Sequence, residues 1–126
     1  MEGSKAQNKE TGDIGEKVAC IFLRRKGFNV IATKVRAAWC EIDIIAEKEG
    51  VVHFVEVKSV THQNIAGSYR PEELVHHAKL DKISRFAEFY MNKENDTRDY
   101  QIDVVGVFLD VRTRKAQCRI TENVSL

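Results

Sequence analysis

The sequence has no long apolar stretch. No unbroken apolar run is longer than six residues, whereas a helix that crosses a bilayer needs about 20 apolar residues. The first residues are polar and charged, and they contain no apolar segment of the kind that forms a secretory signal. We therefore expect a cytoplasmic protein without a membrane partner.

Cysteine is scarce, and histidine lacks a metal-binding pattern. The three cysteines, Cys20, Cys40 and Cys118, lie 20 and 78 residues apart, which fits neither a disulfide framework nor a paired zinc knuckle. None of the four histidines has another histidine four positions further on, the spacing by which a helix presents two zinc ligands. We expect free thiols and no zinc site.

The chain also lacks a strong excess of charge. Its 20 basic and 19 acidic residues leave a net charge of +1, so the total charge does not indicate a nucleic-acid partner. Residues 17–40, however, contain six basic residues and no acidic one. Such a window is more often a solvated surface than a nucleic-acid contact. The candidate nucleic-acid contacts here and in a later helical segment are Arg24, Arg25, Lys34, Arg36, Lys79 and Lys82.

What the sequence does contain is typical of one globular domain. It has 126 residues, of which 43% are hydrophobic and 31% charged, and a chain of this size buries roughly two thirds of its unfolded surface. Residues 1–11 are polar and punctuated by glycine, so we expect a flexible tail there. Residues 12–126 are expected to form the domain.

Hydrophobic periodicity predicts an α/β protein. Apolar residues at helical spacing, including Ile14 and Ile21, indicate a helix over residues 12–26, which Gly27 would end. A second helix is predicted from Pro71 to about Asn92, after a mobile loop at residues 61–70. Strands are predicted at residues 28–33, 41–46, 51–58, 100–109 and 116–121. The order α-β-β-β-α-β-β favours a mixed central sheet flanked by helices.

Acidic residues lie within the second and third predicted strands. Alternation places Glu41 and Asp43 on one face of their strand, and Glu56 and Lys58 on one face of the next. A two-residue hairpin loop at residues 49–50 would set Asp43 opposite Glu56, and Glu41 opposite Lys58. A longer loop with a bulge would shift these pairs.

Two opposed carboxylates repel each other unless a cation neutralises them. Mg²⁺ or Mn²⁺ would do so, because Mg²⁺ binds carboxylate oxygens at about 2.0–2.1 Å together with waters and phosphate oxygens. Asp43 and Glu56 are the candidate ligands, and Lys58 would hold a water or a phosphoryl oxygen. The alternative is an ordinary cluster of cross-strand ion pairs, with Glu41 paired to Lys58.

These motifs also carry a resemblance to known nucleases. Asp43, twelve intervening residues and then Glu56-Val57-Lys58 resemble the D-(x)n-E-x-K arrangement of the PD-(D/E)xK, restriction-endonuclease-like core. The chain is similar, from Gly12 to about Leu109, to the YraN-like family of predicted endonucleases, which in turn resembles Holliday-junction resolvases. The segments that carry this similarity are residues 12–19, 40–46 and 54–58.

The resemblance implies a role for four residues: a carboxylate at Glu16, metal ligands at Asp43 and Glu56, and a general-base or charge-stabilising lysine at Lys58. Without it, Glu16 would be interpreted as a solvated acid at the edge of the first helix. The chain departs from the pattern at Cys40, where the family usually has glycine, and at Ile42, where the wider nucleases have proline.

The function expected from the sequence is metal-dependent hydrolysis of phosphodiester bonds in nucleic acid. DNA is the expected substrate, Mg²⁺ or Mn²⁺ the expected cofactor, and the resemblance leaves a homodimer open. The alternative is a non-catalytic nucleic-acid-binding module on the same fold. A protein-interaction domain is a third interpretation.

Overall fold

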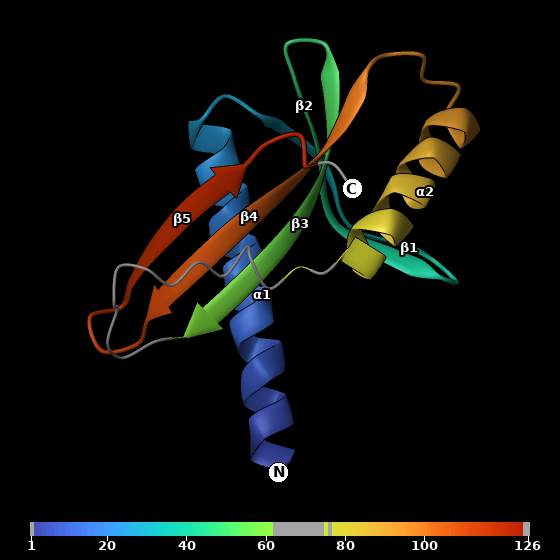
Figure 1. Cartoon of the computed structure of the whole chain (residues 1–126). Coiled ribbons are helices and arrows are strands. Elements are labelled where there is room, and N and C mark those ends of the chain that lie inside the picture. The colour runs from blue at the N-terminus through green and yellow to red at the C-terminus, as the bar shows by residue number, and fades with distance from the viewer. Residues whose placement is uncertain (1, 62–74, 76, 125–126) are drawn as a thin grey trace.

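Two helices flank one mixed sheet, as the sequence predicts (Figure 1). The computed structural model describes residues 2–61, 75 and 77–124, with side chains from residue 9 onward. The five strands follow one another across the sheet in the order β1-β2-β3-β4-β5. The elements are α1 (Glu2–Arg25), β1 (Asn29–Ala37), β2 (Cys40–Lys48), β3 (Val51–Thr61), α2 (His77–Lys93), β4 (Tyr100–Asp110) and β5 (Lys115–Thr121).

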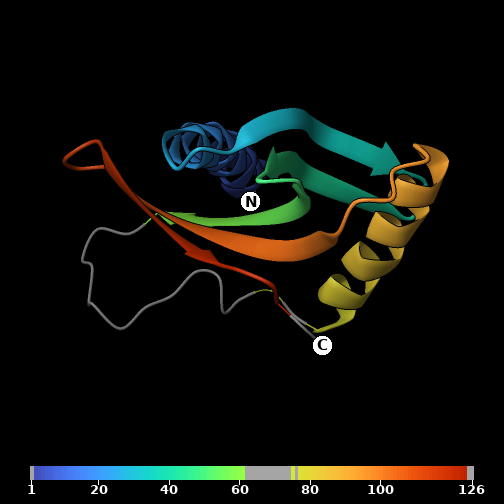
Figure 2. The ribbon, with the colours of Figure 1, turned by 90° about the horizontal axis from the view of Figure 1, so that it is seen from above.

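The helices cover opposite faces of the sheet (Figure 2). Strands β3 and β4 are parallel, as expected when a helix connects them, and all other neighbouring strands are antiparallel. One core lies under α1 and includes Leu23, Val55 and Val105, while a second lies under α2 and includes Phe54 and Phe86. No helix in the described part of the chain is long and apolar enough to span a membrane.

Helix α1 is longer than the sequence predicts. It begins at Glu2 instead of residue 12, so residues 2–11 are helical, whereas we expected a tail. Its end is as predicted: Gly27 has φ 93°, and the Phe28 amide donates to the Leu23 carbonyl at 3.0 Å. This pair of features is a Schellman cap, in which glycine adopts the left-handed conformation without a Cβ penalty.

The face of α1 that packs on the sheet includes Gly15, Ala19 and Leu23. Ala19 and Leu23 are fully buried, whereas Ile14 and Ile21, which belong to the same helical spacing of apolar residues in the sequence, are exposed. At Gly15 the helix comes so close to β3 that an added Cβ would lie 2.3 Å from Oγ of Ser59. The close approach brings the next residue, Glu16, to the sheet.

The hairpin between β2 and β3 has the predicted two-residue loop. Lys48 pairs with Val51, and the loop residues Glu49 and Gly50 have φ 52° and 80°. Two successive positive φ values define a type I′ turn, whose twist matches that of antiparallel strands. The register predicted from this loop length is confirmed as far as Ile44, which pairs with Val55.

The second helix and the last strand agree with the sequence in part. The predicted helix start at Pro71 and residues 62–70 of the loop predicted at 61–70 lie outside the described residues, and Thr61 belongs to β3. Within α2 the buried side chains are Leu80, Ile83, Phe86, Ala87 and Met91. In β5, Cys118 and Ile120 are half-buried as expected, but Ala116 is exposed.

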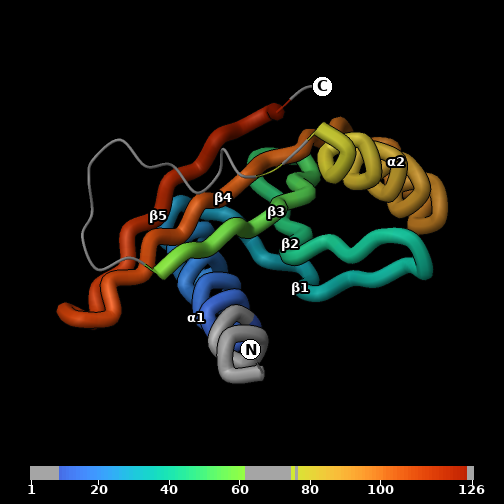
Figure 3. Tube along the Cα trace, turned by 60° about the horizontal axis from the view of Figure 1, so that its bottom comes forward, coloured from blue at the N-terminus to red at the C-terminus, as the bar shows by residue number. Residues whose placement is uncertain are grey.

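The β1–β2 hairpin bends out of the sheet. Ile44 belongs to the core under α1, whereas Ile42, two residues earlier in the same strand, belongs to the core under α2. Figure 3 shows the outer part of this hairpin leaving β3 and continuing alongside α2. Near Asp43, the side chains on one face of β2 thus change from the core under α1 to the core under α2.

The two glycines of α1 should respond oppositely to alanine. Gly15→Ala is expected to destabilise the protein by about 1–3 kcal/mol, because the new methyl group overlaps Ser59. Gly12→Ala is the matched control, since a Cβ there meets nothing within 4 Å, and alanine stabilises a helix interior by about 0.5–1 kcal/mol. Urea unfolding measures both changes. Adding Ser59→Gly should restore the Gly15→Ala variant, and equal effects at the two glycines would contradict the close contact.

Candidate functional site

The ladder between β2 and β3 opens at Asp43. Its described pairs end at Ile44 and Val55, so Asp43 and Glu56 do not form the cross-strand pair that the hairpin register predicts. Instead, Oδ2 of Asp43 accepts a hydrogen bond of 2.7 Å from the Val57 amide. The Asp43 carboxylate thus accepts the hydrogen bond that a backbone carbonyl of β2 would accept in a regular ladder, and the two strands separate here.

The carboxyl groups of Asp43 and Glu56 nevertheless meet. They are hydrogen-bonded to each other, and burial, together with this contact and the charge of Asp43, raises the pKa of Glu56 to about 9. Glu56 is only 8% exposed, and Nζ of Lys79 lies 3.5 Å from its Oε2, which opposes the upward shift of the pKa. At neutral pH Glu56 is therefore protonated and shares its proton with Asp43.

Glu16 adds a third carboxyl group. It belongs to the turn of α1 that the contact between Gly15 and Ser59 holds against β3. Its pKa is raised by burial first and by the charge of Asp43 second. Asp43 thus raises the pKa of two neighbouring acids, Glu16 and Glu56. We call Glu16, Asp43 and Glu56 the carboxyl row, with Asp43 in the middle.

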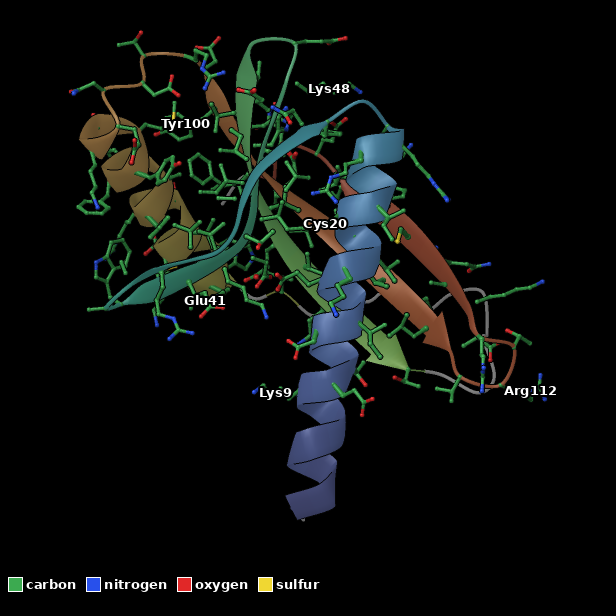
Figure 4. All side chains as sticks on the ribbon, turned by 180° about the vertical axis from the view of Figure 1, so that it is seen from behind. Lys9, Cys20, Glu41, Lys48, Tyr100 and Arg112 are labelled. Atoms are coloured by element: carbon green, nitrogen blue, oxygen red, sulfur yellow. The ribbon has the colours of Figure 1, made fainter. Side chains whose placement is uncertain are left out.

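A groove of about 440 Å³ runs along the α1 side of this row. Its charged lining includes two ion pairs, Lys34 with Asp13 at 3.3 Å and Arg36 with Glu41 at 2.8 Å. Figure 4 shows Glu41 on the outer part of the β1–β2 hairpin and Lys9, another lining residue, on α1. Glu41 therefore pairs across to β1, and the predicted pair of Glu41 with Lys58 is not formed.

Strand β1 is strained beside Asp43. Lys34 has φ 51°, a left-handed conformation that is uncommon outside glycine and costs on the order of 1 kcal/mol or more. It lies between the register pairs of Thr33 with Ile44 and Val35 with Ile42, which places it opposite Asp43. Both strands of the hairpin therefore depart from regular β-structure at the same place, at the facing residues Lys34 and Asp43.

Lys58 lies outside the groove. Alternation places it on the same side of β3 as Glu56, which faces α2, while Val57 and Ser59 line the groove on the α1 side. Its side chain is exposed and forms no ion pair with any residue that the structure describes. An approaching anion can therefore reach this ammonium group.

The six predicted nucleic-acid contacts form two groups, one on each side of the carboxyl row. Lys34 and Arg36 line the groove, and Arg24 borders a second groove of about 610 Å³ beside it. Arg25 belongs to the same last turn of α1. Lys79 and Lys82 lie on α2 instead, where Lys79 contacts Glu56. The contact between Lys79 and Glu56 was not predicted, because nothing in the sequence relates these two positions.

Another set of metal-type side chains escaped the sequence analysis. Ligand atoms of His53, Asp103 and Glu122 lie within 4.8 Å of one another. Asp103 is fully buried, and its Oδ2 lies 2.6 Å from Nδ1 of His53, while Oδ1 accepts from Gln101 and from the Asn123 amide. Both oxygens are satisfied by the chain, so the set holds β3, β4 and the residues after β5 together.

Comparison with known proteins gives the family. The family described as "Uncharacterised protein family UPF0102" matches residues 15–107, a range that contains the whole carboxyl row. The chain belongs to the UPF0102 family. A UPF0102 protein of Campylobacter jejuni is 37% identical over 100 residues, which cover 79% of this chain and 85% of the relative. A UPF0102 protein of Helicobacter hepaticus is 32% identical over 119 residues, covering 94% and 97%.

The raised pKa of Glu56 predicts a pH-dependent stability. The folded protein keeps a proton on Glu56 up to about pH 9, whereas the unfolded chain releases it near its ordinary value of 4.5. The free energy of unfolding should therefore fall as pH rises between these values. Glu56→Gln, which keeps a neutral donor, should be more stable than the wild type at pH 8 and should flatten this part of the curve.

Urea unfolding at pH 5, 7 and 9 with a chelator present measures this effect. Glu41→Gln is the matched control, because its carboxylate pairs with Arg36 at the surface and such pairs contribute about 1 kcal/mol at most. A wild-type curve that rises from pH 5 to 9 would contradict the shared proton.

Proposed function

We propose that this protein is a metal-dependent nuclease that hydrolyses phosphodiester bonds of nucleic acid, with DNA as substrate. The observation that carries the proposal is the contact between the Asp43 and Glu56 carboxyl groups where β2 separates from β3. Proteins rarely bury two acids against each other, and perturbed pairs of this kind are concentrated at catalytic sites.

The residues at this point suit a divalent cation. Mg²⁺ and Mn²⁺ prefer carboxylate oxygens, and Asp43 and Glu56 supply them from neighbouring strands. A proton and Lys79 now offset the repulsion within the pair, and a divalent ion would replace the proton. When bound, such an ion polarises the scissile phosphate and lowers the pKa of the attacking water.

The chain's own side chains would divide the remaining work. Val57 holds the Asp43 carboxylate in one orientation through its amide, so this ligand needs no rearrangement. Lys58 presents an exposed ammonium two residues after Glu56 and would stabilise negative charge developing on the phosphate. Glu16 lies on the groove side of Asp43 and would hold a water there.

Metal binding can be tested separately from turnover. Millimolar Mg²⁺ or Mn²⁺ should raise the melting temperature of the wild type, because a ligand that binds only the folded state stabilises it. Asp43→Asn should abolish this rise. It should itself melt higher at pH 8 without metal, because the Asp43 charge no longer holds on Glu56 a proton that the unfolded chain releases. Asp13→Asn changes a groove acid that pairs with Lys34 and should keep the rise. An equal rise in the Asp43→Asn variant would exclude Asp43 as a ligand.

Turnover is tested at Lys58. Lys58→Met should keep the fold, the metal-induced rise and most DNA affinity, but lose cleavage by about a hundredfold or more, as expected when one preorganised charge is removed. Lys58→Arg should not restore cleavage, because the guanidinium group is planar and bulkier. Lys115→Met, at an exposed lysine of β5, is the matched control and should cleave normally.

The substrates are linear and branched DNAs, incubated with Mg²⁺, Mn²⁺ or a chelator and with protein freed of contaminating nucleases. Cleavage by Lys58→Met at the wild-type rate would remove Lys58 from the mechanism. Binding of these DNAs by the wild type without any metal-dependent cleavage would favour the alternative, a non-catalytic nucleic-acid-binding module.

A further inference from the structure

Trp39 occupies the outer tip of the β1–β2 hairpin. It lies in the two-residue turn between Ala37 and Cys40, which pair with each other, and it is 46% exposed. Its ring contacts Phe86 and Phe89 at centroid distances of 5.9 and 6.4 Å, both at steep interplanar angles. One part of the indole therefore anchors the hairpin on α2, while the rest faces solvent without a parallel ring from any described residue.

Helix α2 continues this aromatic surface in a regular pattern. Five of its residues recur at spacings of three and four, which places them on one side of a helix. We call this set the basic-aromatic stripe, and it consists of Lys79, Lys82, Phe86, Phe89 and Lys93. Phe89 is 47% exposed. The helix acids, Asp81 and Glu88, fall on another side by the same spacing, and Asp81 is paired with Arg85.

The stripe leads from the carboxyl row to Trp39. It starts at Lys79, which contacts Glu56, and reaches Phe89 ten residues later, about 15 Å along a helix with a rise of about 1.5 Å per residue. Along β2, the four residues from Trp39 to Asp43 span about 13 Å at roughly 3.3 Å each. Because stacked nucleotides rise by about 3.4 Å, both paths correspond to about four nucleotides.

We propose that the Trp39 indole stacks on an unpaired base of the nucleic acid, about four nucleotides from the phosphate at the carboxyl row, while the Phe89 ring, tilted by 71° to the indole, packs against the edge of that base. The lysines of the stripe bind the intervening phosphates. The substrate class is therefore nucleic acid with unpaired bases next to the cleaved position. Continuous duplex is the poorer ligand. This inference rests on the proposed function, since it uses the carboxyl row as the place of cleavage.

The exposed rings are what distinguish unpaired from paired bases. Lysines alone suffice to bind the phosphates of a duplex, and they do so without regard to pairing. Within a duplex each base is covered by its stacked neighbours and presents only its edges in the grooves. The exposed indole instead offers a flat face to an unpaired base, with the Phe89 ring beside it. Alternating cations and aromatic rings are typical of single-strand binding surfaces.

The single tryptophan of the chain makes the contact directly observable. Without divalent ions, so that no cleavage occurs, a single-stranded oligonucleotide should quench Trp39 emission, whereas a blunt duplex of the same sequence should bind with little quenching. By anisotropy of a labelled oligonucleotide, Trp39→Ala and Phe89→Ala should each weaken single-strand binding about tenfold, the usual loss when a stacking partner is removed. Both variants should bind duplex within about twofold of the wild type, because the phosphate contacts are kept.

Val111→Ala is the control, since it shortens an exposed apolar side chain in the β4–β5 turn, away from the stripe. It should bind both ligands normally. Phe89→Ala keeps the test decisive if Trp39→Ala unfolds, because Phe89 lies on the helix surface and circular dichroism reports the fold of either variant. Equal losses for single strand and duplex, or unchanged Trp39 emission on saturation with single strand, would overturn the proposal.

The test of the stacking surface and the test of nuclease activity can fail independently of each other. Selective quenching by single strand with no metal-dependent cleavage would support the stacking surface and count against the nuclease. Metal-dependent cleavage by Trp39→Ala and Phe89→Ala at wild-type rates on both single-stranded and duplex DNA would leave the nuclease standing and overturn the stacking surface.

Discussion

The hydrogen bond from the Val57 amide to the Asp43 carboxylate is the interaction on which the rest of the site depends. A backbone donor at that place would normally pair with the neighbouring strand, and an unpaired buried amide is costly. By supplying the acceptor from a side chain, Asp43 lets β2 leave β3 without that penalty. The β1–β2 hairpin therefore packs against α2. Where β2 separates from β3, Glu16 approaches Asp43 from the α1 side and Glu56 from the α2 side.

The electrostatics of the carboxyl row work against the stability of the fold. Glu56 is buried beside another acid, holds a proton that water would remove, and receives only a partly exposed lysine in compensation. An apolar residue in its place would fold more easily. Local conflicts of this kind in an otherwise consistent sequence are typical of sites under functional constraint. The left-handed backbone of Lys34 on the adjacent strand is a second conflict at the same level.

The local features of the fold were predictable, and the departures have physical causes. Turn chemistry at Glu49 and Gly50 gave the β2–β3 register correctly as far as Ile44, because short loops tie strand pairing to neighbouring residues. Periodicity could not show that Asp43 would replace a backbone acceptor and end the ladder. It also failed on α1, where Ile14 and Ile21 are exposed since the helix approaches the sheet through glycine and alanine. The contact of Lys79 with Glu56 and the network of Asp103 join distant segments, for which no spacing rule exists.

The network around Asp103 also constrains when the chain can complete its fold during synthesis. The carboxylate on β4 receives one of its donors from the Asn123 amide, and the Val124 amide donates to the carbonyl of Ile102. Until these late residues emerge from the ribosome, the buried acid lacks a partner that its burial requires. A chain that stopped shortly before residue 123 would still form β5 and cover the edge of β4, but Asp103 would have one donor fewer and the Ile102 carbonyl would lose the Val124 amide.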